Sequence, residues 1–112
     1  MARLLAIVEA NFDDRVFTVE QCSVWMQFWA VAPYRPGLSR LHRINRARVR
    51  GHVRAELRAL LPAETFETAR EALQNYMDGV WLEAAQSGGA LDPAEARREA
   101  VRVVKLLLAA SA

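Results

Sequence analysis

Apolar residues recur along this chain at spacings of three and four, the pattern of helices that bury one side. β-Branched residues never alternate with polar ones over the length of a strand. Turn signals divide the pattern into five segments, which predicts an all-α bundle of about five helices joined by short connections. Short connections favour roughly antiparallel neighbours. The predicted helices cover Arg3–Asn11, Thr18–Ala32, Gly37–Leu61, Pro62–Gln86 and Asp92–Ala110.

Several helix ends carry recognisable capping residues. Thr18 is placed as an N-cap with Gln21 three residues later, the spacing of a capping box. Pro62 suits the first turn of the fourth helix, and residues 87–89 (Ser-Gly-Gly) suit its end. Residues 92–95 (Asp-Pro-Ala-Glu) combine an N-cap, a proline at the first helical position and an acid at the third. These signals predict where three of the four connections lie.

The second predicted helix has an aromatic face. Trp25, Phe28 and Trp29 lie three and four residues apart, on the same side as Cys22 and Ala32. Ordinary core packing explains each ring taken singly. Two indoles on one short face, each with an N–H that needs a partner when buried, also fit the wall of a cavity. Both interpretations stay open at this point.

Polar residues interrupt the apolar side of the third predicted helix. Asn45 and His52 lie seven residues apart near the middle of that side, and Arg48 lies at its border. Polar groups in such positions must be hydrogen-bonded or hydrated. They form either a satisfied core network or the polar lining of a ligand pocket. The apolar side itself is defined by Leu38, Leu41, Val49, Val53 and Leu60.

The opposite side of the same helix carries a row of arginines. Such a row is the one feature of the chain that could suggest nucleic-acid binding. Aromatic stacking residues do not interleave with it, and acidic residues elsewhere nearly balance the charge, so a solvated face is the preferred interpretation. The row consists of Arg40, Arg43, Arg46, Arg50, Arg54 and Arg58.

The last two predicted helices are strongly apolar. Asp78 lies at the edge of an apolar face of the fourth helix, near Trp81, and suits a surface acid, an interhelical hydrogen-bond acceptor or the counter-ion of a bound cation. Val103 and Leu106 widen the stripe of the last helix beyond what one neighbour needs, which favours a subunit partner. The core of that stripe is Val101, Val104, Leu107 and Leu108.

Composition narrows the class of protein. The chain has 112 residues, 15 Lys+Arg against 13 Asp+Glu, and 53% hydrophobic residues, which predicts one domain over 1–112. The single Cys22 forms no internal disulfide, so a reducing, cytoplasmic setting is expected. No apolar run approaches the roughly 20 residues of a membrane span. No nucleophile elbow, phosphate loop or metal motif occurs, so we expect neither an enzyme nor a metal or cofactor site.

Five stretches of the sequence together resemble the C-terminal domain of BetI-type repressors of the TetR family. They are ANFDD, WMQFWA, LSRLHRINRARVR, LRALLP and MDGVWLEAAQSGGALD, in the same order and with matching spacing, and the similarity covers about residues 3–110. The resemblance implies an all-helical domain that binds a small effector in a cavity among its central helices and forms a homodimer. It also implies choline as the effector and regulation of choline-to-glycine-betaine genes.

The resemblance supplies roles for particular residues. A quaternary ammonium ligand needs aromatic faces, one charge partner and an acceptor for a hydroxyl group. Arg48 at the pocket border would oppose a cation and would suit an anionic ligand better. The expected ligand-binding residues are Trp25, Phe28, Trp29, Asn45, His52, Tyr76, Asp78 and Trp81. The expected dimer-interface residues, from the last two helices, are Met77, Ala84, Val101, Val104, Leu107 and Leu108.

Members of this family read DNA through an N-terminal helix-turn-helix domain. We expect no such domain within these residues, because nothing upstream of Arg3 encodes one. We therefore expect these 112 residues not to bind an operator alone. The competing interpretation is a helical dimerisation module with a filled core and no effector. A cavity beside the two tryptophans of the second helix distinguishes the two.

Overall fold

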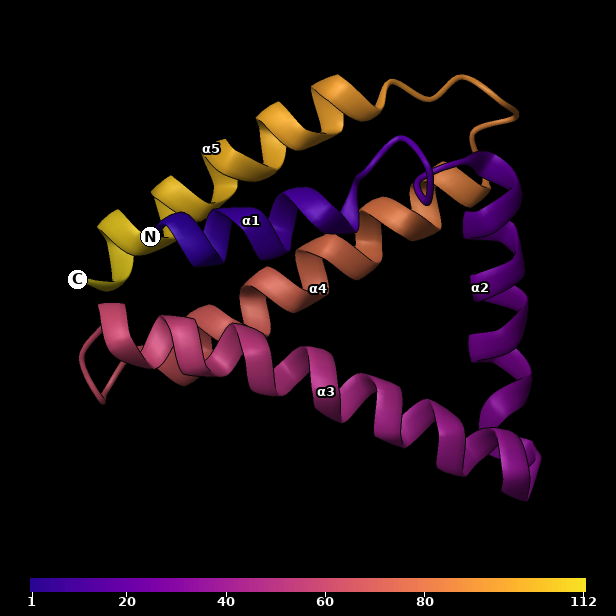
Figure 1. Cartoon of the computed structure of the whole chain (residues 1–112), viewed down its shortest axis with the longest axis horizontal. Helices are drawn as coiled ribbons and strands as arrows, with labels where there is room; N and C mark the ends of the chain where they lie inside the picture. Colours follow the sequence, from indigo (N-terminus) through magenta and orange to yellow (C-terminus); the bar gives the residue numbers. More distant parts are fainter.

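A computed structural model describes all 112 residues, and it is entirely helical. It contains five α-helices, as the sequence pattern predicts. The α-helices are α1 (Ala2–Asn11), α2 (Val19–Val31), α3 (Pro36–Leu60), α4 (Phe66–Ala85) and α5 (Pro93–Ser111). A short 3₁₀ turn, Ala32–Tyr34, joins the second helix to the third. Figure 1 shows α1, α4 and α5 side by side, with α2 across the far ends of α3 and α4.

The predicted caps and turns are confirmed at most helix ends. The Thr18 hydroxyl accepts a hydrogen bond from the Gln21 backbone N–H at 3.1 Å, and the Asp92 carboxylate accepts one from the Glu95 N–H at 3.2 Å. Gly88 and Gly89 have φ of 75° and 116°, the left-handed region that glycine enters without steric cost. Both glycines lie in the connection between α4 and α5, where the Ser-Gly-Gly signal predicts the end of the fourth helix.

The start of α4 differs from the prediction. Pro62 does not open the helix, because the Pro62 carbonyl accepts hydrogen bonds from Thr65 and Phe66 in a separate turn, each at 3.1 Å. The preceding residue, Leu61, is extended, as residues before proline tend to be. α4 therefore begins at Phe66, four residues later than expected.

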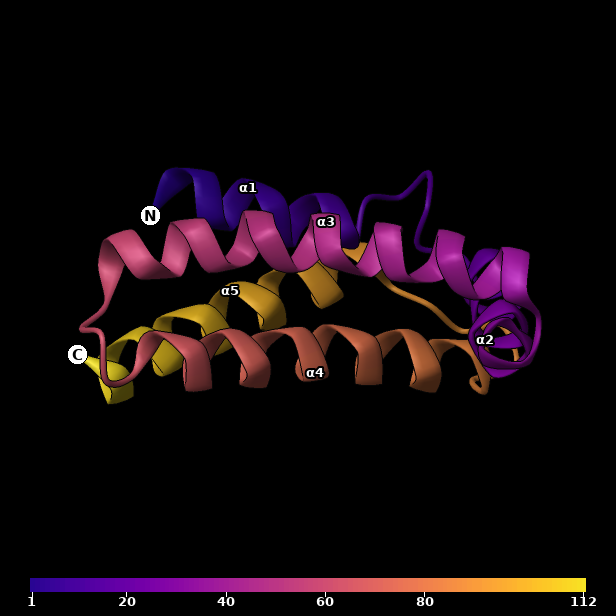
Figure 2. The ribbon, with the colours of Figure 1, turned by 90° about the horizontal axis from the view of Figure 1, so that it is seen from below.

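The helices form a flat slab of 37 × 34 × 18 Å. Figure 2 shows α1 and α3 in one layer and α4 in the other, with α5 crossing obliquely between their levels. α3 and α4 meet at the turn between them and diverge, and α2 spans the gap between their far ends (Figure 1). The expected antiparallel packing is wrong for α2, which runs across its neighbours and packs mainly on α4.

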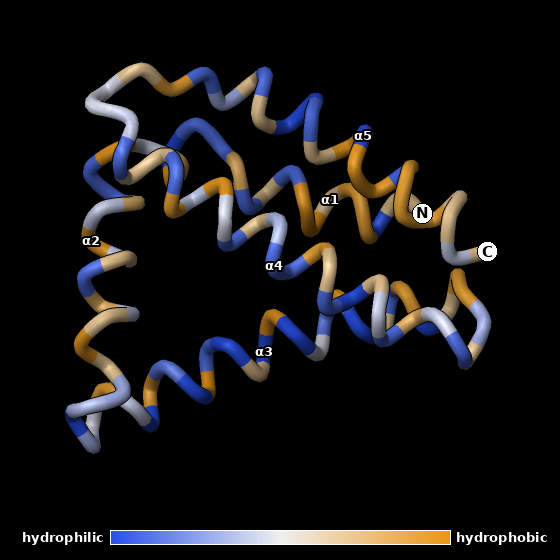
Figure 3. Tube along the Cα trace, turned by 180° about the vertical axis from the view of Figure 1, so that it is seen from behind, coloured by the Kyte–Doolittle hydropathy of each residue, from blue (hydrophilic) through white to orange (hydrophobic).

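The packed core lies where α1, α4, α5 and the C-terminal half of α3 come together. Leu4 and Val8 of α1 are fully buried there. Phe12, the C-cap of α1, and Val53 of α3 are fully buried in the same place. By contrast, α2 buries only Cys22. Figure 3 shows hydrophobic positions concentrated on α1 and the C-terminal half of α5, whereas α3 is largely hydrophilic. The space between α2, α3 and α4 is thus outside the packed core.

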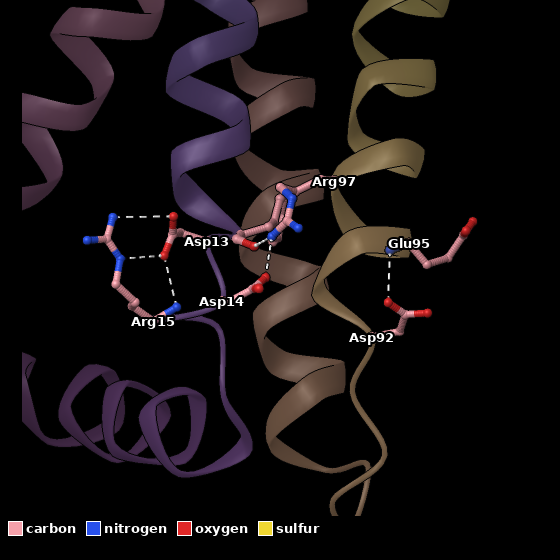
Figure 4. Close-up of polar contacts among 7 residues, drawn as sticks. Asp13, Asp14, Arg15, Asp92, Glu95 and Arg97 are labelled. Carbon is pink, nitrogen blue, oxygen red and sulfur yellow. Dashed lines mark hydrogen bonds and ion pairs between the residues drawn. The ribbon is translucent and has the colours of Figure 1, made fainter.

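An arginine of α5 fixes the connection between α1 and α2. The Arg97 guanidinium donates to the Phe12 carbonyl at 2.9 Å and to the Asp14 carboxylate at 2.6 Å (Figure 4). Asp13 pairs with Arg15 on the same connection, at 3.0 Å. These contacts tie the end of α1 to α5 and so set where α2 begins.

None of the five helices combines the length and apolarity needed to cross a membrane.

Candidate functional site: an aromatic cavity between three helices

A cavity of about 290 Å³ lies between α2, α3 and α4, and the end of α1 closes one side of it. Its volume is at the lower end of the range for small-molecule sites, and a mostly apolar wall with a few polar groups is typical of such sites. The wall consists of Ala10, Asn11, Val16, Trp25, Trp29, Asn45, Arg46, Val49, Gln74, Met77, Asp78 and Trp81.

All three tryptophans of the chain line this cavity. Trp25 and Trp29 are one turn apart on α2, so their rings project from the same face. Phe28 packs edge-on against Trp25 with ring centroids 5.6 Å apart and supports the wall from behind. Trp81 comes from α4 and is held by its indole N–H, which donates to the Asn11 carbonyl at 3.2 Å. The cavity is therefore walled by indole rings from two helices.

A bidentate ion pair crosses the wall between α3 and α4. Arg46 donates to the two carboxylate oxygens of Asp78 at 2.9 and 2.6 Å. The hydrogen bond to Asp78 raises the pKa of Arg46 above its usual value, which keeps the guanidinium charged. The same guanidinium lies over the Trp29 ring, 5.2 Å from its centroid, within cation–π range. One protein cation thus bridges the acid and the aromatic face.

Two donors at the cavity lack a hydrogen-bond partner. The side-chain amide nitrogen of Asn11 and the indole nitrogen of Trp29 are both buried and unpaired. Buried donors of folded proteins are nearly always paired with protein or water, so unpaired ones need an explanation. Neither nitrogen is in contact with solvent, so a ligand or water oxygen would reach it only after the side chains that cover it move.

The rest of the wall is neutral. Asn45 adds a polar amide from α3, and Val49 and Met77 add apolar surface. No cluster of histidine, cysteine and acidic side chains able to hold a metal ion is present. Burial raises the pKa of the Cys22 thiol to about 11, so this side chain is a core residue and not a nucleophile at neutral pH. The arrangement suits binding of a small molecule.

Comparison with known proteins decides the family. The model of the BetI-type transcriptional repressor C-terminal domain matches residues 1–109. The chain belongs to this family.

Curated relatives agree with the family match. The HTH-type transcriptional regulator BetI of Cronobacter sakazakii is 39% identical over 111 residues, which are 99% of this chain and 55% of that protein. The regulators of the same name from Ectopseudomonas mendocina and Burkholderia thailandensis are each 36% identical, over 96% of this chain and 55% of their own length. The BetI-type domain described here thus spans about half the length of these relatives. No solved structure matches the chain.

Five of the eight expected ligand-binding residues of this BetI-type domain line the cavity. They are Trp25, Trp29, Asn45, Asp78 and Trp81.

The other three expected ligand-binding residues lie elsewhere. Phe28 supports the wall without lining it, and Tyr76 lines a different depression beside Glu83 and Glu99. His52 is wrong as a pocket residue, because it is solvent-exposed. Its neighbour Val53 takes the buried side of α3 instead.

The arginines of α3 also need correction. Arg46, assigned to the solvated row, points to Asp78 and lines the cavity, whereas Arg48, expected at the pocket border, is exposed. Arg46 precedes the buried Val53 and Leu57 by seven and eleven residues, so spacing along α3 already places it on the packed side. The signal was missed because Leu57 was not counted among the residues that define the apolar side. Asn11 was missed for a different reason, since it comes from the end of another helix.

The expected dimer-interface residues of the BetI-type domain separate into two groups. Met77, Ala84 and Val104 are buried within the single chain, at 5%, 3% and 1% exposure, so they offer no surface to a partner. Their apolar faces pack between α4, α5 and the rest of the core. Val101, Leu107 and Leu108 are half-buried. Leu106, noted only as widening the stripe, is 70% exposed.

Proposed function

We propose that this BetI-type domain is the effector-binding and dimerisation part of a transcriptional repressor, and that its effector is a quaternary ammonium compound such as choline. The observation that carries the proposal is the cavity walled by all three tryptophans of the chain. A quaternary ammonium cannot donate hydrogen bonds, so aromatic faces and a carboxylate are what remains to recognise it. This cavity offers both.

The polar groups of the wall suit the other end of such a ligand. The Asn11 amide and Trp29 indole are unpaired donors, and a ligand hydroxyl or carbonyl oxygen can accept from them. Three cation–π contacts of up to about 2 kcal/mol each, with one charge partner, reach the roughly −8 kcal/mol of micromolar binding. A ligand with a compact cation and a short oxygen-bearing arm fits both groups.

The cavity also supplies a way to couple binding to conformation. Its walls belong to α2, α3 and α4, of which α2 has little buried surface of its own. A ligand that prefers one arrangement of these helices shifts the population toward it. In a dimeric repressor, such a shift would change how the two subunits present their DNA-reading parts.

Dimerisation is proposed through α4 and α5. Leu82 and Leu106 are 46% and 70% exposed on these two helices, and Val101, Leu107 and Leu108 of α5 are half-buried. Exposed apolar surface of this kind is a mark of interaction sites. A second copy of the same two helices is the proposed partner.

Calorimetry tests the effector. Choline, betaine aldehyde and glycine betaine are titrated into the chain, with 3,3-dimethyl-1-butanol as the uncharged isostere of choline. We expect choline to bind with a Kd on the order of micromolar. The isostere should bind at least about tenfold more weakly, because it lacks the cation. No heat with any ligand, at protein concentrations well above micromolar, would instead favour the module without an effector.

A further inference from the structure

Arg46 occupies the place in the cavity wall where a ligand cation would be most favourable. Its guanidinium lies 5.2 Å from the centroid of the Trp29 ring and is bound to both carboxylate oxygens of Asp78. Those two groups are the aromatic face and the acid that a quaternary ammonium would use. In the ligand-free chain, therefore, a side chain already uses them.

We propose that Arg46 is an internal competitor for the cation site, and that a quaternary ammonium ligand binds by displacing its guanidinium from Trp29 and Asp78. The inference rests on the proposed function, because it presumes a cationic ligand in this cavity. It adds that Arg46 sets the apparent affinity of the site for its ligand.

Coulomb repulsion makes displacement necessary. With Arg46 in place, the acid is fully engaged, and a second cation on Trp29 would lie beside the guanidinium with no free carboxylate. Like charges a few ångströms apart in a partly dehydrated site repel strongly. Once the guanidinium leaves, the ligand cation and Asp78 form a neutral pair again. The charge of the cavity is then the same before and after binding.

The structure also gives the guanidinium somewhere to go. The side chains of Arg46 and Asp78 are 31% and 30% exposed, so water competes for both partners of the ion pair. Arg46 also lines a second, open groove together with His42, Arg43 and Arg50. Rotation of its flexible side chain would carry the charge from the cavity into water.

α3 contains a matched arginine outside the cavity. Arg54 donates to Glu67 of α4 at 2.9 Å and lies 5.2 Å from the centroid of the Phe66 ring. It thus makes the same two kinds of contact, but both of its partners belong to α4, and it does not line the cavity. Removing its charge costs the fold an ion pair from α3 to α4, a more exposed one with a single hydrogen bond, and leaves the proposed site unchanged.

The test compares choline and tetramethylammonium binding to the wild-type chain, R46M and R54M by calorimetry. If the pair is closed about nine-tenths of the time, only a tenth of the molecules are competent, and R46M should lower the apparent Kd about tenfold. R54M should leave the Kd unchanged. In the double variant R46M/D78N the gain should disappear, because the freed carboxylate is what the ligand acquires. Thermal unfolding followed by circular dichroism checks each fold, and R46Q replaces R46M if the latter does not fold.

The outcomes separate this inference from the proposed function. Binding by the wild type with equal or weaker binding by R46M would overturn the role of Arg46 and leave the effector site standing. A gain that survives in R46M/D78N would overturn the competition for Asp78. Absence of binding by both the wild type and R46M, up to millimolar ligand, would overturn the proposed function itself. Binding by R46M alone would support the inference most strongly, since it would mean that Arg46 keeps the site closed.

Discussion

At the scale of single residues, two tryptophans of one cavity differ in how their indole N–H groups are satisfied. Trp81 donates to the Asn11 carbonyl at 3.2 Å, whereas the buried Trp29 nitrogen has no partner. Burying a polar group without a hydrogen bond costs free energy, so Trp29 is not optimised for the stability of the empty domain. Its indole N–H remains available to the proposed ligand as a donor.

This difference predicts responses of different size to the same substitution. W81F should lower the free energy of unfolding by about 1 kcal/mol more than W29F does, because only W81F removes a hydrogen bond. The loss of ring area is common to both variants and cancels in the comparison. Urea unfolding followed by circular dichroism measures the difference. Equal losses, or a larger loss for W29F, would mean that the Trp29 N–H is satisfied in solution.

Cys22 provides a second prediction at this scale. Burial raises its thiol pKa to about 11 from an ordinary value of 9.0, so the folded state favours the protonated form. The resulting contribution to stability is present below about pH 9 and is lost as the pH rises toward 11. At pH 8 the folded chain should react with a thiol reagent such as Ellman's reagent far more slowly than the chain in denaturant. Rapid reaction of the folded chain would contradict the buried placement of Cys22.

At the scale of helices, the capping residues were the most predictive part of the sequence. Thr18 and Asp92 each accept the backbone hydrogen bond that their position implies, because an N-cap acts through residues two or three positions away. Pro62 shows the limit of such local rules. Proline is compatible both with the first turn of a helix and with a separate turn before it, and the packing of Phe66 in the core selects the second.

The cap of α5 can be tested directly. D92A should lower the free energy of unfolding by about 1 kcal/mol, since the Glu95 N–H loses its acceptor. D92N keeps an acceptor oxygen in the same place and should be nearly neutral, which makes it the matched control. Thermal unfolding of the three proteins measures both effects. A loss in D92N equal to that in D92A would assign the effect to charge and not to capping.

The side chains of the candidate site that share a face of one helix were predictable from the sequence. The contacts that they make with another helix were not. Trp25 and Trp29 share a face of α2 by spacing alone, so their joint presence in the wall followed from the sequence. Arg46 lies seven and eleven residues before the buried Val53 and Leu57, so its place on the packed side of α3 also followed from spacing. Its partner Asp78 belongs to α4, and that contact is not contained in the pattern of a single helix.

At the scale of the whole molecule, the flat slab leaves several large apolar residues in water. Leu106 on α5 is 70% exposed and Leu82 on α4 is 46% exposed. Leu41 on α3 is 56% exposed but lies on a different helix from the proposed interface. A domain only 18 Å thick has little interior in which to bury such side chains. We propose that association with a second copy buries Leu106 and Leu82.

Two substitutions, one on α5 and one on α3, test the proposed dimer. L106E should weaken self-association at least about tenfold, because it places a charge at the most exposed large apolar side chain of α5. L41E introduces the same charge at a comparably exposed leucine of α3 and should leave association unchanged. Sedimentation velocity at roughly 50 µM compares the three proteins under conditions where the dimer is favoured by mass action. A monomeric wild type, or equal effects of both substitutions, would contradict the interface.

The central claim is that the cavity between α2, α3 and α4 binds a quaternary ammonium ligand. Because all three tryptophans line it, every indole N–H resonance of the isotope-labelled chain reports on this cavity. Titration with choline should shift all three signals along one saturable curve, with the largest shift at Trp29. If no indole signal moves with choline at concentrations up to about 10 mM, the claim is wrong, because any binding would then be weaker than roughly −3 kcal/mol.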